Sequence, residues 1–160
     1  GEGTNTVAAA MRFILVHELG HIFGQVKQVS LPFSEKFPDL SVSPFMAESW
    51  ESENSVPRPR GAPWAQRVKF YRKVPPYKLS EAVVLYQDLR RTKFATLYSV
   101  TDTEEDWAET FALYVHCVLL KKHYRVIFQE NGESTVLAAD LILSDALKEK
   151  RRFVETALSR

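Results

Sequence analysis

The sequence predicts a mainly α-helical domain of the α+β class, with a loop-rich region in its middle. Three observations support this prediction. Apolar residues recur at helical spacing in both flanks, all eight prolines lie between Pro32 and Pro76, and the length of 160 residues fits one domain. At this length, folding buries roughly 68–70% of the surface that the unfolded chain exposes, enough for one hydrophobic core. We therefore expect a single domain over residues 1–160.

The first half of the chain predicts one helix followed by loops. Residues 5–24 carry apolar side chains such as Val7 at helical spacing, and Gly24 is a typical helix stop. Proline removes a backbone donor and restricts φ, so the region 32–76 is expected to be loop-rich. It contains one candidate strand, residues 68–71.

The second half predicts three more helices. Residues 80–92 begin with Ser80, a favourable N-cap, and residues 103–123 begin with an acidic run related to a capping box. A last amphipathic helix is expected over residues 135–158, after the turn-like pair Asn131-Gly132.

Composition excludes several classes of function. The chain carries 21 Lys+Arg against 20 Asp+Glu, so no overall field draws it onto nucleic acid or anionic lipid. A single cysteine, Cys117, excludes an internal disulfide and four-cysteine zinc sites, and its apolar neighbours indicate an inert buried thiol. No apolar run approaches the roughly 18 residues that span a bilayer, so we expect no transmembrane segment.

The start of the chain has no signal-peptide pattern. A chemical motif nevertheless begins at His17, which is early for a complete enzyme. We therefore expect that the domain was excised from a longer protein. If a leader was removed with the missing part, a secreted or periplasmic location is favoured.

That motif is His17-Glu18-Leu19-Gly20-His21, an HExxH pattern inside the first expected helix. Residues four apart lie on one helix face, so His17 and His21 can bind one zinc ion. Glu18 is rotated by about 100°, which keeps it away from the metal but beside the open coordination position. There it can take a proton from a bound water, whose pKa zinc lowers to about 7. The alternative is a helix with two surface histidines and a solvated glutamate.

A catalytic zinc site usually needs a third protein ligand. No histidine follows Gly24 at the spacing that metzincins use, so the ligand must come from far along the chain. The best candidate is Glu109, in the run Glu105-Asp106-Trp107-Ala108-Glu109, which is expected on a second helix packed against the first. Glu48 is a rival, but its surroundings are loop-like and hold a ligand less rigidly.

HELGH followed by LYQDLRRTKFATLYSVTDTEEDWAETFALYV resembles zinc-dependent metallopeptidases of gluzincin type, in which a downstream ED(F/W)AE(T/S)F segment supplies a glutamate ligand. The resemblance covers residues 11–24 and 79–115. It implies a zincin-like fold, with an active-site helix and a glutamate helix beside a small or incomplete β-sheet. It also implies that Glu109 is the zinc ligand, whereas Glu105 and Asp106 support the ligands or cap the helix.

Tyr98 is a candidate oxyanion donor, because relatives have a tyrosine shortly before the glutamate helix. The alternative is a half-buried strand tyrosine beside Phe94 and Leu97. Two further histidines have simpler interpretations. We expect His116 to be a core or interface residue rather than part of the cleft, and His123 to be solvated.

These observations predict a zinc-dependent metallopeptidase that acts on a peptide or protein. His17, His21 and Glu109 would hold Zn²⁺, Glu18 would act as general base, and Tyr98 would assist the oxyanion.

Two alternatives stay open. One is an interaction module that holds zinc without turnover, because little chain precedes His17 to build the sheet edge on which relatives bind a peptide. Strands at 68–74 and 94–100 would have to supply that edge. The other is a non-peptide amidohydrolase with the same zinc site.

Overall fold

The fold was examined in a computed structural model, which describes residues 6–27, 29, 43–53, 56–68, 70 and 81–159. The helices and strands are, in order, α1 (Val7–Val26), α2 (Pro44–Ala47), β1 (Trp50–Glu53), β2 (Val56–Pro59), α3 (Ala82–Leu89), α4 (Thr103–Leu113), β3 (Arg125–Glu130), β4 (Glu133–Ala139) and α5 (Lys148–Leu158). The strands form two antiparallel pairs, β1 with β2 and β3 with β4. A mainly helical structure with small sheets confirms the α+β prediction.

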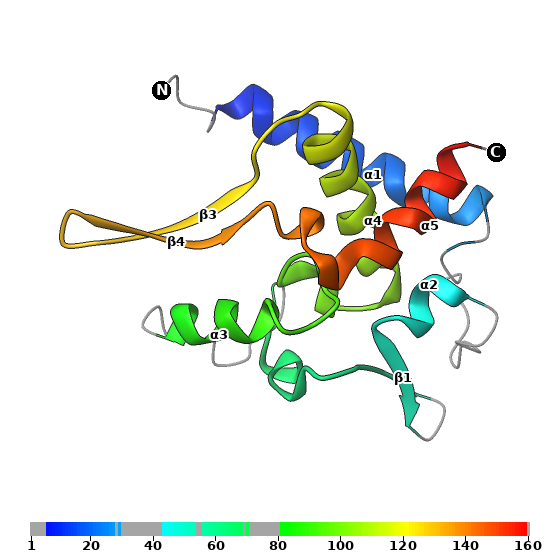
Figure 1. Cartoon of the computed structure of the whole chain (residues 1–160), viewed down its shortest axis with the longest axis horizontal. Helices are drawn as coiled ribbons and strands as arrows, with labels where there is room; N and C mark the ends of the chain where they lie inside the picture. Colours follow the sequence, from blue (N-terminus) through cyan, green and yellow to red (C-terminus); the bar gives the residue numbers. More distant parts are fainter. Residues whose placement is uncertain are drawn as a thin grey trace.

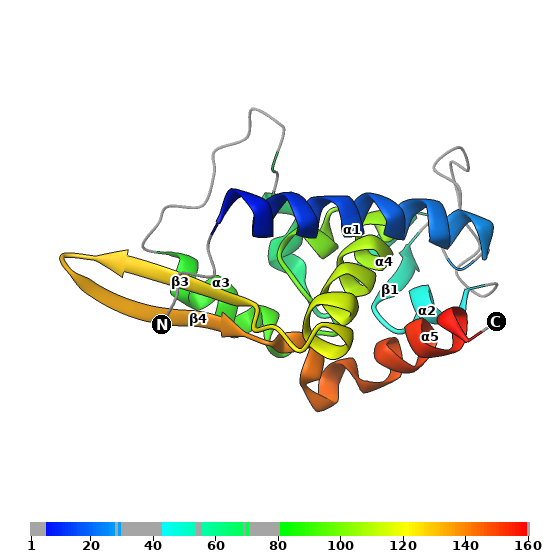
Figure 2. The ribbon, with the colours of Figure 1, turned by 90° about the horizontal axis from the view of Figure 1, so that it is seen from above.

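Helix α4 is the centre of the structure. Figure 2 shows α1 on one side of α4 and α5 on the other, and Figure 1 shows α2 and β1 near α5. Thr103 and every residue from Asp106 to Leu113 are buried. Its aromatic side chains join the main core, where the Trp107 ring lies edge-on to that of Phe45 at 5.1 Å. Any group that α4 carries is therefore held rigidly by packing on several sides.

Helices α1 and α4 approach each other closely at Gly20. A Cβ atom added there would lie 3.1 Å from the Cα atom of Ala108 and 3.3 Å from the side chain of Phe111. The Trp107 indole Nε1 donates a hydrogen bond to the Gly20 carbonyl oxygen at 2.8 Å. This contact sets which residues of the two helices face each other.

Replacing Gly20 by Val should lower the free energy of unfolding by about 1–3 kcal/mol, because the added atoms overlap backbone that cannot move away. Urea denaturation measures the effect. Ala10→Val, at an exposed site of the same helix, is the matched control and should cost less than about 1 kcal/mol. Equal losses in the two variants would contradict a close α1–α4 contact.

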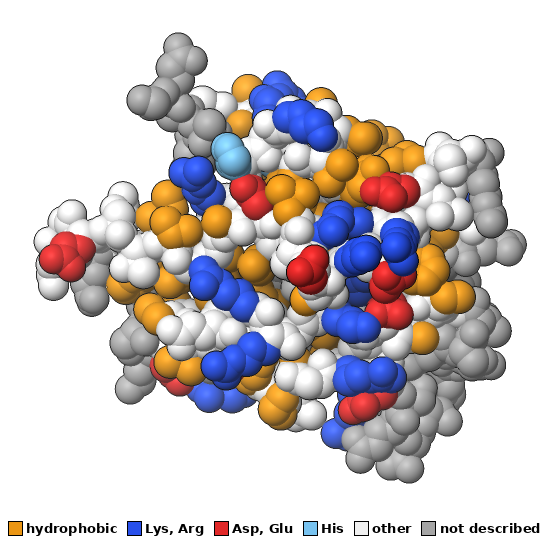
Figure 3. All heavy atoms as spheres, in the orientation of Figure 1, with side chains coloured by type: hydrophobic (Ala, Val, Ile, Leu, Met, Phe, Trp, Pro, Cys, Tyr) orange, Lys and Arg blue, Asp and Glu red, His pale blue; other side chains and the backbone are white. Residues whose placement is uncertain are grey.

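The outer side of α1 is apolar and uncovered by the described residues. Seven large side chains are more than half exposed: Val7, Met11, Ile14, Leu15, Leu19, Ile22 and Val26. By length and composition alone α1 could span a membrane, a weak indication because signal sequences and core helices pass the same test. Figure 3 shows basic and acidic side chains interspersed on one face of the molecule. On α5, Arg152 forms an ion pair with Glu149.

The predicted helix over residues 135–158 is wrong in its first part. Residues 125–139 form the β3–β4 hairpin, and α5 begins only at Lys148. The turn of the hairpin projects beyond the helices in Figures 1 and 2, whereas α3 lies beside β4. Asn131 and Gly132 have φ values of 51° and 82°, as a two-residue hairpin turn requires. The Asn-Gly pair therefore connects two strands instead of preceding a helix.

Other boundaries also differ from the predictions. Helix α1 continues past Gly24 to Val26, and α4 continues through a π-helical segment, Tyr114–Leu119, to end before residue 123. Residues 94–100 contain a short 3₁₀ turn, Tyr98–Val100, and no strand.

Some predictions lie partly or wholly outside the described residues. Ser80 is one, so the start of the predicted helix over 80–92 is seen only from residue 81 onward. Within the candidate strand 68–71, Val68 and Phe70 are described and belong to no strand. Lys69 and Tyr71 are not described, and neither are residues 32–42, 54–55 and 72–76 of the proline-rich region.

Candidate metal centre

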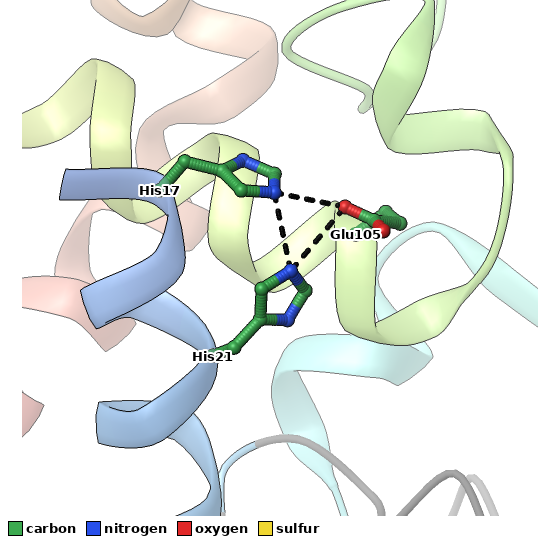
Figure 4. Close-up of side chains that lie close together, drawn as sticks. All are labelled: His17, His21 and Glu105. Atoms are coloured by element: carbon green, nitrogen blue, oxygen red, sulfur yellow. Dashed lines mark hydrogen bonds and ion pairs between the residues drawn. The ribbon is translucent and has the colours of Figure 1, made fainter. Parts of the chain in front are cut away.

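Two helices bring together three side chains whose ligating atoms lie close to one another. His17 and His21 come from α1, and Glu105 comes from the first turn of α4 (Figure 4). The Nε2 atoms of the two histidines are 3.1 Å apart. Oε2 of Glu105 lies 3.0 Å from Nε2 of His17 and 3.4 Å from Nε2 of His21. Two imidazoles and a carboxylate therefore form one compact triangle.

The triangle has the dimensions of one face of a zinc site. With metal–ligand bonds of about 2.0–2.2 Å, tetrahedral ligands lie roughly 3.3 Å apart. Oε2 of Glu105 is buried and accepts no hydrogen bond of good geometry, although two imidazoles lie within ion-pair distance. A buried carboxylate oxygen without a hydrogen bond needs an explanation, and a cation would satisfy it. Nitrogen and carboxylate donors in this number fit Zn²⁺.

Local sequence explains how each helix presents its side chains. In α1, the four-residue spacing of His17 and His21 places both rings on the side that faces α4. In α4, the Asp102 side chain accepts hydrogen bonds from the backbone N–H groups of Glu104 and Glu105, at 3.0 and 2.9 Å. This N-cap starts the helix so that Glu105 lies in its first turn.

Glu109, the predicted third ligand, lies behind His17 rather than beside both Nε2 atoms. Its Oε1 accepts a hydrogen bond from Nδ1 of His17 at 2.8 Å, and its Oε2 accepts one from the Thr96 hydroxyl at 2.7 Å. Both carboxylate oxygens of Glu109 are therefore engaged. A neutral His17 that donates from Nδ1 keeps the lone pair of Nε2 directed at the triangle.

The positions within the EDWAE run thus differ from those that the resemblance implies. Glu105 lies beside both imidazoles, and Glu109 contacts Nδ1 of His17. Sequence spacing alone could not show which of the two glutamates lies beside both imidazoles, because residues four apart on α4 face α1 equally well. Thr96 was not identified from the sequence, where no motif marks it.

The short distances within the triangle shift the pKa values of its three side chains. Burial lowers the pKa of His17, but its contacts with the Glu105 and Glu109 carboxylates outweigh burial and raise the pKa to about 9. The contact with the Glu105 carboxylate also raises the pKa of His21. Burial raises the pKa of Glu105, yet the two histidines outweigh it and lower the pKa to about 2. Without a metal the site therefore binds protons, which an incoming cation must displace.

Glu18 and Tyr98, the two predicted catalytic residues, lie in different environments. Glu18 is exposed on α1. The Tyr98 hydroxyl donates a hydrogen bond to Oε1 of Glu105 at 3.1 Å, and its ring lies 5.8 Å from that of His17. Phe70 packs edge-on against the Tyr98 ring at 5.0 Å. Tyr98 thus contacts the candidate metal group from a 3₁₀ turn and not from the strand considered as its alternative.

The remaining candidates lie outside the triangle. Glu48 forms an ion pair with Lys93. His116 stands edge-on to the Phe13 ring and contacts the backbone oxygen of His123. His123 is exposed, and its Nδ1 lies 2.7 Å from an Asp140 carboxylate oxygen.

Cys117 is buried, as the sequence predicts. Burial, with a smaller contribution from Asp140, raises the pKa of its thiol to about 12. Such a thiol is inert as a nucleophile at neutral pH.

No protein-family model, curated protein or solved structure matches the chain.

Proposed function

We propose that this protein is a zinc-dependent metallopeptidase with a zincin-like arrangement of two helices, in which His17, His21 and Glu105 hold the metal. The observation that carries the proposal is the triangle of three ligating atoms, separated by 3.0–3.4 Å, on an HExxH helix and a glutamate helix. A triangle of this size needs little rearrangement to receive an ion. The resemblance to gluzincins around HELGH and EDWAE supports the same assignment.

Zinc bound here would lower the pKa of a water ligand to about 7 and polarise the scissile carbonyl. Glu18 is assigned the role of general base, since its exposed carboxylate follows His17 directly along α1. It accepts the proton of the attacking water and returns it to the nitrogen of the leaving amine.

Three other side chains support the reaction. The Tyr98 hydroxyl lies at the edge of the triangle, on Glu105, and is assigned as hydrogen-bond donor to the oxyanion. Glu109 keeps His17 in the orientation that directs Nε2 at the metal, and Thr96 holds Glu109 through its second oxygen.

Metal analysis followed by a peptide-library cleavage assay tests the proposal. The purified protein should hold one zinc ion per chain, cleave peptides, lose cleavage on treatment with a chelator and regain it when zinc is restored. Zinc binding without cleavage of any peptide would favour the interaction module. Hydrolysis of small amides alone would favour the amidohydrolase. A chain that binds no stoichiometric zinc would contradict all three functions.

A further inference from the structure

A buried ion pair lies directly behind the metal-binding turn of α4. Asp106 follows Glu105 in the chain and is completely buried, as is Lys150 of α5, with exposed fractions of 0% and 1%. The Lys150 ammonium lies 2.6 Å from one carboxylate oxygen of Asp106 and 2.5 Å from the other. The pair therefore joins α5 to α4 one residue away from a candidate ligand.

A third segment also binds the same carboxylate. The Ser49 hydroxyl and the Trp50 indole Nε1, at the junction between α2 and β1, donate to Oδ2 of Asp106 at 2.8 and 2.9 Å. Burial raises the pKa of Asp106, but four donated contacts favour its ionised form. Two segments far from α4 in the sequence thus converge on one of its side chains.

Aromatic rings enclose the cationic partner. The Lys150 ammonium lies 4.8 Å from the centroid of the Phe45 ring and 5.0 Å from that of Phe94. Desolvation of a buried ion pair offsets much of its attraction, so apolar replacement of both partners is often neutral or stabilising in proteins. Net stability therefore does not by itself explain the pair. Hydrogen bonds and ion pairs are directional, so they restrict the rotation of the helix that carries them more than apolar contacts do.

That rotation matters at the metal centre. Successive helix residues are about 100° apart, so bonds that hold Asp106 toward α5 also hold Glu105 toward α1. Glu109 lies three residues beyond Asp106 and shares the same rigid helix. A small rotation of α4 would change the distances from Glu105 and Glu109 to the His17 ring together.

We propose that Asp106 and Lys150, with Ser49 and Trp50, are positioning residues that set the rotation of α4 and thereby the geometry of the metal centre. The inference rests on the proposed zinc site.

Its test compares zinc affinity, measured by chelator competition, in the parent and in the double variant Asp106→Leu/Lys150→Met. The double variant removes both charges while keeping apolar volume. It should fold with a lower melting temperature than the parent, because the buried Ser49 hydroxyl and Trp50 indole lose their acceptor. It should also bind zinc at least about tenfold more weakly and show an altered visible spectrum when loaded with cobalt(II).

Val154→Ala is the matched control, because Val154 is buried in the hydrophobic core on α5, one turn beyond Lys150. It should lower the melting temperature while leaving zinc affinity within twofold of the parent and the cobalt spectrum unchanged. If the ion pair only stabilised the fold, the double variant would likewise have a lower melting temperature with an unchanged zinc affinity and cobalt spectrum.

Two outcomes would overturn the inference. One is a folded double variant with the zinc affinity and cobalt spectrum of the parent.

If the double variant fails to fold, Ser49→Ala/Trp50→Phe replaces it, since these changes leave the ion pair intact. A zinc affinity within twofold of the parent in that variant is the second overturning outcome, and a loss of threefold or more supports the inference. A parent protein that binds no zinc would instead contradict the proposed function itself.

Discussion

Replacing Glu18 by Gln is expected to leave zinc bound and to lower peptide cleavage by about 10²–10⁴-fold. The amide of glutamine has nearly the same size as the carboxylate but cannot accept the proton of the attacking water. Glu18 is exposed on α1, so the substitution should not disturb the packing of α1 on α4. Zinc content and cleavage rate, measured on the same sample, give the result.

Arg12→Gln is the control for this experiment. Arg12 is also exposed on α1 but precedes the HExxH motif by more than one turn, so its replacement should leave cleavage unchanged. A Glu18→Gln variant that cleaves as fast as the parent would show that another group takes the proton, and the proposed mechanism would be wrong.

Zinc affinity should distinguish the two glutamates of α4. Glu109→Gln is expected to weaken zinc binding by about 10–100-fold, the usual effect of removing a partner of a ligating histidine. Glu105→Gln should weaken it by more than about 100-fold, because a neutral amide replaces the carboxylate oxygen that lies with both Nε2 atoms. The two substitutions are isosteric and one helical turn apart, so each serves as the control for the other.

Competition with a chromophoric chelator gives the two affinities, and circular dichroism checks that both variants are folded. The opposite order, with Glu109→Gln the more damaging, would return the ligand role to Glu109 as the resemblance implies. Equal and small losses would show that neither carboxylate holds the metal.

Much of the candidate site could be predicted because it depends on local helix geometry. The HExxH spacing alone places His17 and His21 on one face, and the acidic run before Trp107 alone indicates a second helix that carries carboxylates. Both helices are present, and they pack against each other. The prediction did not depend on any contact between distant residues.

The hairpin shows where local patterns were misread. The spacing of the apolar residues after Asn131-Gly132 predicts a helix, although an Asn-Gly pair between such runs is a strong hairpin signal. The strand alternation after the turn is short, and the apolar side chains of Ile127 and Val136 are about half exposed. With so little burial on either face, periodicity gave a weak signal for strand over helix.

The sequence by itself determined the donors of the candidate site: two imidazoles at one helical turn and carboxylates on a second helix. It did so because the rise and rotation of a helix depend only on neighbouring residues. Only the tertiary structure decided which carboxylate meets the imidazoles. That choice depends on how α1 and α4 align at Gly20 and on how Lys150 holds Asp106, and these contacts join residues 44 or more positions apart. No local pattern encodes the alignment of two such segments, because it results from the packing of the whole core.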